Sequence, residues 1–161
     1  MPPHDKSSTF HPAPLSSNLS IPELYQYHAL NSPKHPVFAY SDTNARTSTT
    51  ICYQEAWTCI QTTACIISEH MARVPIIPGK ERPVIAIMAQ SDTMSHIYSI
   101  LAIMALGYVA FPMSPRNDAQ TAANLLKATG VQYMLVDTGG SIHALARDAV
   151  QTLQKFGDEI G

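Results

Sequence analysis

The feature that most constrains the fold is a repeated alternation between short apolar runs and longer segments of helical period. Residues 84–89 form an unbroken apolar run, as expected of a strand covered on both faces of a parallel sheet. Further strands are predicted at 108–111 and 131–136. Gly107 and Gly130 precede these two strands, at the ends of the intervening helices. Because strand and helix alternate, we predict an α/β fold with a doubly wound parallel sheet and right-handed crossovers.

Polar residues stand at the predicted starts of the intervening helices. Ser91 and Asp92 can cap a helix that runs to about Leu106. Asn117 or Asp118 can cap the next one, which runs to residue 129. The last predicted helix has one apolar face, made of Ile142, Leu145, Ala146, Ala149 and Leu153.

Two glycine-containing segments are candidates for phosphate-binding loops. Residues 137–141 lie between a strand and a helix, where backbone amides could receive a phosphate. They lack the GxGxxG and GxxxxGK[ST] spacings, so a tight turn with Ser141 as helix cap is favoured. The pair Gly79-Lys80 fails the same test, because Glu81 follows where a hydroxyl is needed for magnesium.

The first half of the chain has a different pattern. Residues 1–20 combine prolines with many serines, which predicts a flexible leader. A short helix is expected from Ile21, with Ser20 as cap and Pro22 in its first turn. Residues 37–40 and 49–53 suggest a hairpin. The next helix begins at about residue 54 and presents one apolar face, made of Ala56, Ile60, Ala64, Ile67 and Met71.

Composition excludes several classes of function. The chain has 161 residues and a net charge of −2, with 45% hydrophobic and 14% charged residues, which suits one globular domain. We expect neither nucleic acid nor membrane as a partner, since no basic surface is indicated. Residues 93–115 carry no charge, but Ser99 and Gly107 interrupt them and favour a core helix and strand over a membrane span. Without a signal-like apolar stretch at its start, the protein is expected to be cytoplasmic.

Residue chemistry alone predicts no active site. Ser91 and Ser114 follow strands, but neither lies in GxSxG nor has an identifiable histidine and acid partner. The cysteines form neither an even set nor a CxxC pair and are interpreted as reduced thiols: Cys52, Cys59 and Cys65. The seven histidines show no HExxH motif and no helical ligand spacing: His4, His11, His28, His35, His70, His96 and His143.

Several segments resemble motifs of adenylate-forming enzymes. Residues 105–115, ALGYVAFPMSP, resemble the second core motif of that family, in which a helix end, a small residue pair and an aromatic precede a proline. Residues 51–56, ICYQEA, look like the first short motif, where a strand with an aromatic runs into the first helix. Residues 111–117 and 125–131 look most like fungal carboxylic acid reductases of the nonribosomal-peptide-synthetase-like type. The resemblance covers residues 21–153 and only the first part of such a domain.

The resemblance implies an organisation for the chain. Residues 21–155 would be the N-terminal portion of an AMP-binding adenylation domain with the acetyl-CoA-synthetase-like fold, and residues 156–161 a short tail. In those reductases, a carrier domain and a nicotinamide-dependent reductase domain follow. The implied partners are therefore the remainder of the adenylation domain, these two domains and a small carboxylic acid substrate. The implied cofactors are ATP and Mg²⁺, with phosphopantetheine and NADPH in the reductase type.

The sequence also departs from that family. The phosphate-binding loop, rich in Ser, Thr and Gly and ending in Pro-Lys-Gly, is not found, and the hydroxyl-rich residues 41–50 contain no Gly or Lys. The later motifs for adenine, ribose and the reacting carboxylate would lie beyond Gly161. Both matching motifs are structural in the family, so no catalytic, cofactor-binding or metal-binding residue is assigned. Because adenylation needs positioned donors and a cation on the developing charge, we expect the chain to be catalytically incomplete alone.

Two other interpretations stay open at this point. The parent enzyme could be a simple acyl-CoA ligase, since no carrier or reductase domain is visible. The chain could also be a self-contained α/β binding module that acts on an acyl-activating partner. An incomplete domain would leave an open sheet edge that is prone to pairing, whereas a self-contained module would unfold cooperatively as a monomer.

Overall fold

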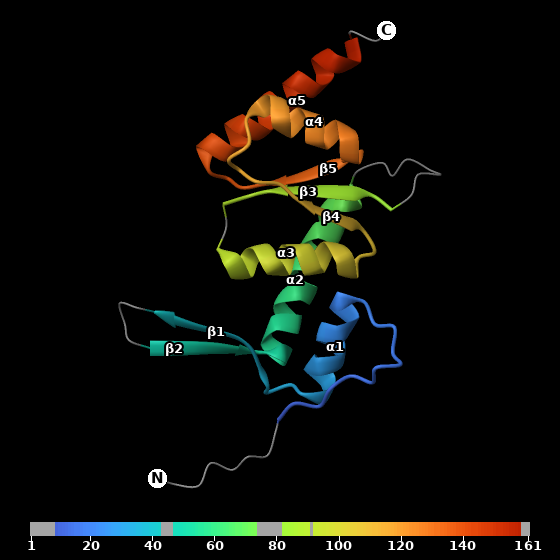
Figure 1. Cartoon of the computed structure of the whole chain (residues 1–161), viewed down its shortest axis with the longest axis vertical. Coiled ribbons are helices and arrows are strands. Elements are labelled where there is room, and N and C mark those ends of the chain that lie inside the picture. The colour runs from blue at the N-terminus through green and yellow to red at the C-terminus, as the bar shows by residue number, and fades with distance from the viewer. Residues whose placement is uncertain (1–8, 43–46, 74–81, 91, 159–161) are drawn as a thin grey trace.

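The computed structural model describes residues 9–42, 47–73, 82–90 and 92–158. Figure 1 shows an elongated molecule, with a layered α/β unit at one end and a helix and a hairpin at the other. The long helix α2 (Tyr53–Met71) runs between the two ends.

The α/β unit is built on three parallel strands in the order β4-β3-β5. Their bounds are β3 (Val84–Met88), β4 (Val109–Pro112) and β5 (Tyr133–Val136). Ile85 of β3 is in register with Ala110 of β4 and with Tyr133 of β5. The predicted strands are confirmed, and β3 is buried from Ile85 to Met88 because it has a neighbour on each edge and helices on each face.

One face of the sheet is covered by α2 and α3 (Thr93–Ala105). Ile85 and Ile87 point to this face, where the apolar side of α2 meets them. The predicted helical face is confirmed: Ala64 is partly buried, and the other four members are buried, namely Ala56, Ile60, Ile67 and Met71.

The opposite face is covered by α4 (Ala119–Thr129) and α5 (Gly140–Asp158). Ala86 and Met88 point to this face, alternating with the isoleucines of β3 as strand geometry requires. Three of the residues predicted for the apolar side of α5 are buried there: Ile142, Ala146 and Ala149. Because α3 and α4 make their crossovers on opposite faces, the doubly wound parallel sheet is confirmed (Figure 1).

Two helices end at glycines in the left-handed conformation, as predicted. The φ angles of Gly107 and Gly130 are 78° and 63°. At the other end of α4, the Asp118 carboxylate accepts a hydrogen bond from the backbone N–H of Thr121 at 2.7 Å, which confirms Asp118 as the cap.

The predicted cap of α5 is wrong. Ser141 lies inside the first turn, and the first hydrogen bonds of the helix run from the N–H groups of Ile142 and His143 to the carbonyl of Gly139. The helix begins early because the Asp137 carboxylate accepts the Gly139 N–H at 3.3 Å and so forms the turn before Ser141 is reached.

The other end of the molecule holds α1 (Ile21–Asn31) and a hairpin of β1 (Pro36–Asp42) with β2 (Thr47–Cys52). Both were predicted. Ser20 precedes α1 as its cap. The backbone N–H and the hydroxyl of Ser20 donate hydrogen bonds to the Glu23 carboxylate, at 2.7 and 2.6 Å.

The segment before α1 differs from the expectation of a flexible leader through residue 20. The ring of Phe10 stacks on His28 with 4.7 Å between centroids, and the backbone N–H of His11 donates to Ser32 Oγ at 2.7 Å. The composition of the segment does not predict this contact, because a single aromatic side chain is enough to dock a proline- and serine-rich segment onto the domain.

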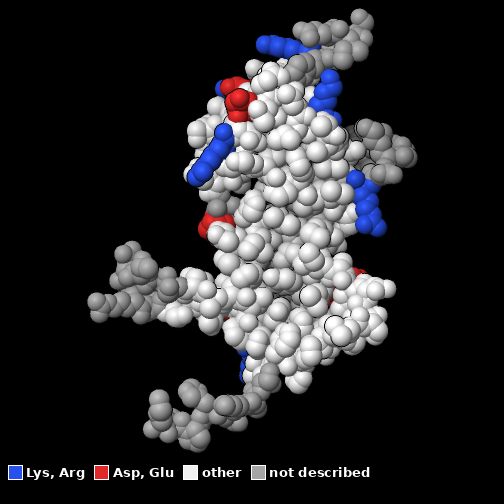
Figure 2. Space-filling model, viewed as in Figure 1, with Lys and Arg blue, Asp and Glu red and all other residues white. Residues whose placement is uncertain are grey.

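Charged side chains are sparse on the surface. Figure 2 shows them mainly over the α/β unit, with a broad uncharged area elsewhere on the same face. Within the described part of the chain, no helix combines the length and the apolar composition that crossing a bilayer requires.

Candidate functional site

The carboxyl edge of the sheet is the candidate site. In open α/β sheets, ligands bind beyond the carboxyl ends of strands, where successive connections leave on opposite faces. Here β3 continues into α3 on one face, and β5 continues into α5 on the other. The strands β3 and β5 are neighbours, so the switch point lies between their carboxyl ends.

Asp137 joins these two strand ends. Its backbone N–H donates to the carbonyl of Met88 at 3.1 Å, and its Oδ2 accepts a hydrogen bond from the backbone N–H of Gln90 at 3.2 Å. Its Oδ1 accepts from Gly139. Because both carboxylate oxygens are engaged with backbone donors, Asp137 holds the shape of the switch point.

Two cavities open at this edge and share Ala89. The first, of about 210 Å³, lies at the switch point between α3 and the end of β5, and Ser95, Ser99 and Asp137 supply its polar groups. The second, of about 440 Å³, lies between the start of α3 and the end of β4. Its lining is largely apolar, with the residues Ala89, Thr93, His96, Ile97, Pro112, Met113, Ser114 and Pro115. Both could accommodate small uncharged groups.

The N-terminus of α3 is occupied by its own cap. Asp92 Oδ1 accepts from the backbone N–H groups of Met94 and Ser95, at 2.9 and 3.0 Å, and Oδ2 accepts from the Ser95 hydroxyl at 2.6 Å. The Ser95 hydroxyl and then the backbone donors lower the pKa of Asp92 below its ordinary value. The resident carboxylate therefore fills the place where a helix end would bind an external anion.

The serine candidates do not form a nucleophilic pair. Ser114 and His96 line the same cavity, yet no hydrogen bond joins them in the described structure. Instead, Ser114 Oγ accepts the backbone N–H of Arg116 at 3.2 Å and so forms a local turn. Ser91 lies outside the described residues, as does the Gly79-Lys80 pair.

The described residues do not fit the phosphates of a nucleotide or a metal ion. Across the described ranges, no group of three or more His, Cys, Asp and Glu side chains could hold a metal. The hydroxyl-rich residues 47–50 belong to β2, which lies on the far side of α3 from the sheet (Figure 1). No phosphate-binding step is therefore assigned to the residues that the structure describes.

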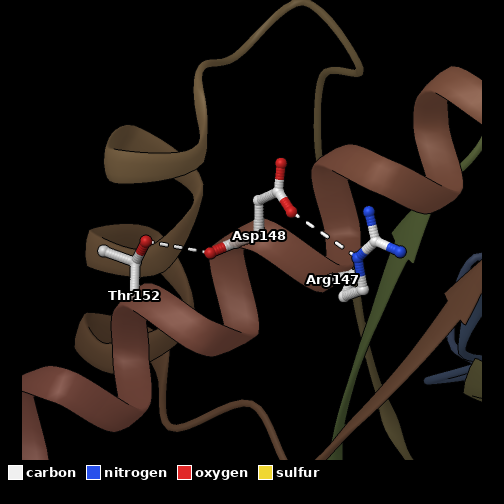
Figure 3. Close-up of polar contacts among 3 residues, drawn as sticks. All are labelled: Arg147, Asp148 and Thr152. Carbon is white, nitrogen blue, oxygen red and sulfur yellow. Dashed lines mark hydrogen bonds and ion pairs between the residues drawn. The ribbon is translucent and has the colours of Figure 1, made fainter.

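An ion pair on α5 lies on the outer surface of the α/β unit (Figure 3). Arg147 Nε is 3.6 Å from Asp148 Oδ1, and the two side chains are 63% and 54% exposed. The Thr152 hydroxyl donates to the carbonyl of Asp148 at 2.8 Å. An exposed pair of this kind adds little stability and no chemistry to the site.

Comparisons with known proteins give a consistent result. No protein-family profile matches the chain. The adenylate-forming reductase Nps10 of Heterobasidion annosum is 29% identical over 153 residues, 92% of this chain and 14% of the relative. The adenylate-forming reductase Nps11 of Serpula lacrymans is 31% identical over 151 residues, 93% of this chain and 13% of the relative. The chain thus spans about one seventh of the length of these curated relatives.

Solved structures with the same fold point the same way. The N-terminal subdomain of Klebsiella oxytoca NpsA in complex with anthranilyl-AMSN has a TM-score of 0.58 at 18% identity, over 75% of this chain and 28% of that one. The chain matches the N-terminal part of an adenylate-forming domain. A fatty acyl-adenylate ligase from L. pneumophila has a TM-score of 0.52 at 11% identity, over 70% of this chain and 19% of the ligase.

The segments that resemble adenylate-forming motifs have structural roles in this chain. Residues 105–115 contain the end of α3, the left-handed Gly107 and β4, and they finish in the wall of the larger cavity. Residues 51–56 contain the junction of β2 and α2, where Glu55 accepts the backbone N–H of Cys52 at 2.8 Å. The role of Asp137 was not predicted from the sequence, and the signal that could have found it is its position directly after a predicted parallel strand, at the edge where α/β sheets bind ligands.

Proposed function

We propose that this chain forms the opening part of an ATP-dependent, carboxylate-activating enzyme of the carrier-linked carboxylic acid reductase type. The supporting observation is the match to adenylate-forming reductases over 93% of the chain, together with the adenylate-forming fold. In this proposal residues 21–155 belong to the adenylation domain, with a leader over 1–20 and a tail over 156–161. Their role is to build the scaffold beside the reaction site.

The cofactors and partners of that enzyme follow from the same proposal. ATP is the cofactor that an adenylate-forming family implies. Because the described residues do not fit its phosphates, ATP and Mg²⁺ would be held by the remainder of the adenylation domain. A small carboxylic acid would be the substrate. Carrier and reductase domains would supply phosphopantetheine and NADPH chemistry in a cytoplasmic enzyme.

The two cavities support a positional role for the chain. They flank the carboxyl ends of β3, β4 and β5, and their walls contain apolar, hydroxyl and imidazole groups and the Asp137 carboxylate, but no cationic side chain of Lys or Arg. Walls of this kind can shape a pocket for the organic part of a substrate, whereas charge developing on a phosphate needs fixed donors or cations.

Exchange of radiolabelled pyrophosphate into ATP tests the proposal. The purified chain, shown to be folded by circular dichroism, is assayed with a panel of carboxylic acids, and intact Nps11 serves as the positive control. We expect the chain alone to match the enzyme-free blank. Acid-dependent exchange by the chain alone would refute the claim that its catalytic groups lie elsewhere.

A further inference from the structure

An apolar groove of about 490 Å³ runs along the outer edge of β5. The C-terminal half of α2 forms its roof with Ile66, His70 and Met71, and β5 forms its floor with residues that include Leu135. Ile66 is 53% exposed here, whereas Met71 at the back of the groove is only 6% exposed. The lining is mostly aliphatic, and its polar groups belong to Gln132, Tyr133 and His70. The Nδ1 of His70 is hydrogen-bonded to the carbonyl of Ile66 at 2.8 Å.

The groove lies where the sheet ends. In the described structure β5 is the last strand in the order β4-β3-β5, so no strand occupies its outer edge. Parallel sheets are normally buried, and exposed apolar edges invite pairing. The apolar roof that α2 forms beside this edge provides a surface against which the side chains of one more strand can pack.

Connection handedness gives the direction in which the sheet would continue. The crossover from β4 through α4 to β5 passes over one face and moves from one side of β3 to the other. Helix α5 leaves β5 on that same face, packed against α4. A right-handed crossover through α5 therefore leads to the outer edge of β5, where the groove lies.

We propose that this groove receives one further parallel strand, contributed by the polypeptide that follows α5 in the longer adenylate-forming enzyme. The inference rests on the proposed function. The length of the NpsA N-terminal subdomain supports it, because this chain matches 28% of that subdomain and the other 72% leaves enough polypeptide for a further strand. The occupant is a run of about five apolar residues, because α2 would cover one of its faces and α5 the other.

Backbone geometry singles out one amide as a reporter. The N–H of Gln132 points inward and donates to the carbonyl of Val84 at 3.0 Å. Successive N–H groups of a strand point to alternate edges, so the N–H of Leu135 points outward and that of Met134 inward. A docked strand would supply an acceptor to Leu135 and leave Met134 unchanged.

The test is residue-resolved hydrogen exchange by NMR on the full 161-residue chain. The probe is a synthetic peptide copied from Nps11, covering about 30 residues after the part that aligns with α5, long enough for a loop and a strand. We expect saturating peptide to slow exchange at Leu135 by tenfold or more and to change Met134 little. Unchanged exchange at Leu135 would overturn the proposal.

Two matched variants locate the binding surface. Ile66→Lys places a charge in the groove wall and should abolish the slowing of exchange at Leu135. Val109→Lys places a charge on β4, at the opposite edge of the sheet, and should leave that slowing unchanged. Circular dichroism verifies that both variants fold. Equal loss in both variants would overturn the assignment to this edge.

Other occupants give distinct results. Slowing at Leu135 that rises with protein concentration and needs no peptide would identify a second copy of the chain and overturn the proposed occupant. If the peptide does not slow exchange at Leu135, the proposed function is still tested separately by the pyrophosphate-exchange assay. Exchange by the chain alone would refute the proposed function whatever the peptide does.

Discussion

Asp137 Oδ2 accepts a hydrogen bond from the backbone N–H of Gln90 at 3.2 Å, across 47 residues of sequence. The contact joins the segments that follow β5 and β3, on either side of the switch point. Because the other carboxylate oxygen binds Gly139, one side chain both fixes the strand ends and forms the turn into α5. The smaller cavity of the candidate site is bounded by this residue.

Replacing this carboxylate should destabilise the fold. Asp137→Ala removes two acceptors of backbone N–H groups, and we expect a loss of about 1 kcal/mol in the free energy of unfolding, since the group is half-exposed. Asp137→Asn keeps one acceptor oxygen and should lose less. Urea denaturation measures both variants. An Asp137→Ala variant as stable as the native chain would contradict this role.

The left-handed end of α4 gives a second prediction. Gly130 has φ of 63°, and a Cβ added there would meet nothing within 4 Å, so only backbone strain opposes a side chain. Gly130→Ala should lower the free energy of unfolding by about 1 kcal/mol, and Gly130→Asn by less because Asn tolerates this conformation. The ranking of midpoints in urea tests the argument, and it fails if Ala is the better tolerated.

The buried imidazole of His28 predicts a dependence of stability on pH. His28 is 3% exposed, packed against Phe10 and Tyr53, and its Nδ1 has no hydrogen-bond partner in the described structure. Burial lowers the pKa of His28 below 6.5, and the nearby His35 acts in the same direction, against a hydrogen bond to the backbone of His11.

The sign of the His28 effect follows from that lowered pKa. The unfolded chain binds the proton more readily, so the contribution is complete above pH 6.5 and declines as the pH falls below it. The midpoint of urea denaturation should therefore decrease as the pH is lowered from 7.5 to 5.5. The decrease should be smaller in His28→Gln. Identical slopes for both proteins would contradict the assignment.

Carboxylates at helix starts act in a lower pH range. Hydrogen bonds from Thr121 lower the pKa of Asp118 below 3.8, and those from Ser95 do the same for Asp92. A lowered pKa in the folded state stabilises the fold above the unfolded value of 3.8, and the effect is lost as the pH falls further.

Asp118→Asn separates this titration from capping itself. Asn still accepts the hydrogen bond of the cap but carries no titrating carboxylate. The variant should therefore lose less stability than the native chain when the pH is lowered from 5 to 3. A native-like loss in Asp118→Asn, measured by urea titration at each pH, would place the acid sensitivity elsewhere.

Local sequence signals predicted the framework of the fold. The apolar run at β3, the four-residue spacing on α2 and the glycines after α3 and α4 each depend on neighbouring residues only, and each was confirmed. The start of α5 was misassigned to Ser141, because the turn depends on where the Asp137 carboxylate points. Docking of Phe10 on His28 also escaped prediction, since a contact across 18 residues leaves no periodic trace.

The candidate site was less accessible from sequence. Its walls come from the ends of three strands and the start of α3, and only the order β4-β3-β5 brings them together. No local pattern encodes that order. The adenylate-forming resemblance did predict the family of relatives, because the segments that carry it are short and contiguous.

The most direct test of the central claim is pyrophosphate exchange by a chimera in which this chain replaces the aligned part of Nps11. In our proposal the chain supplies the scaffold of an adenylation domain, and the reacting groups lie in the remainder of that domain. We therefore expect acid-dependent exchange by the chimera and none by the chain alone. A chimera that folds like Nps11 but exchanges no faster than the enzyme-free blank would contradict it.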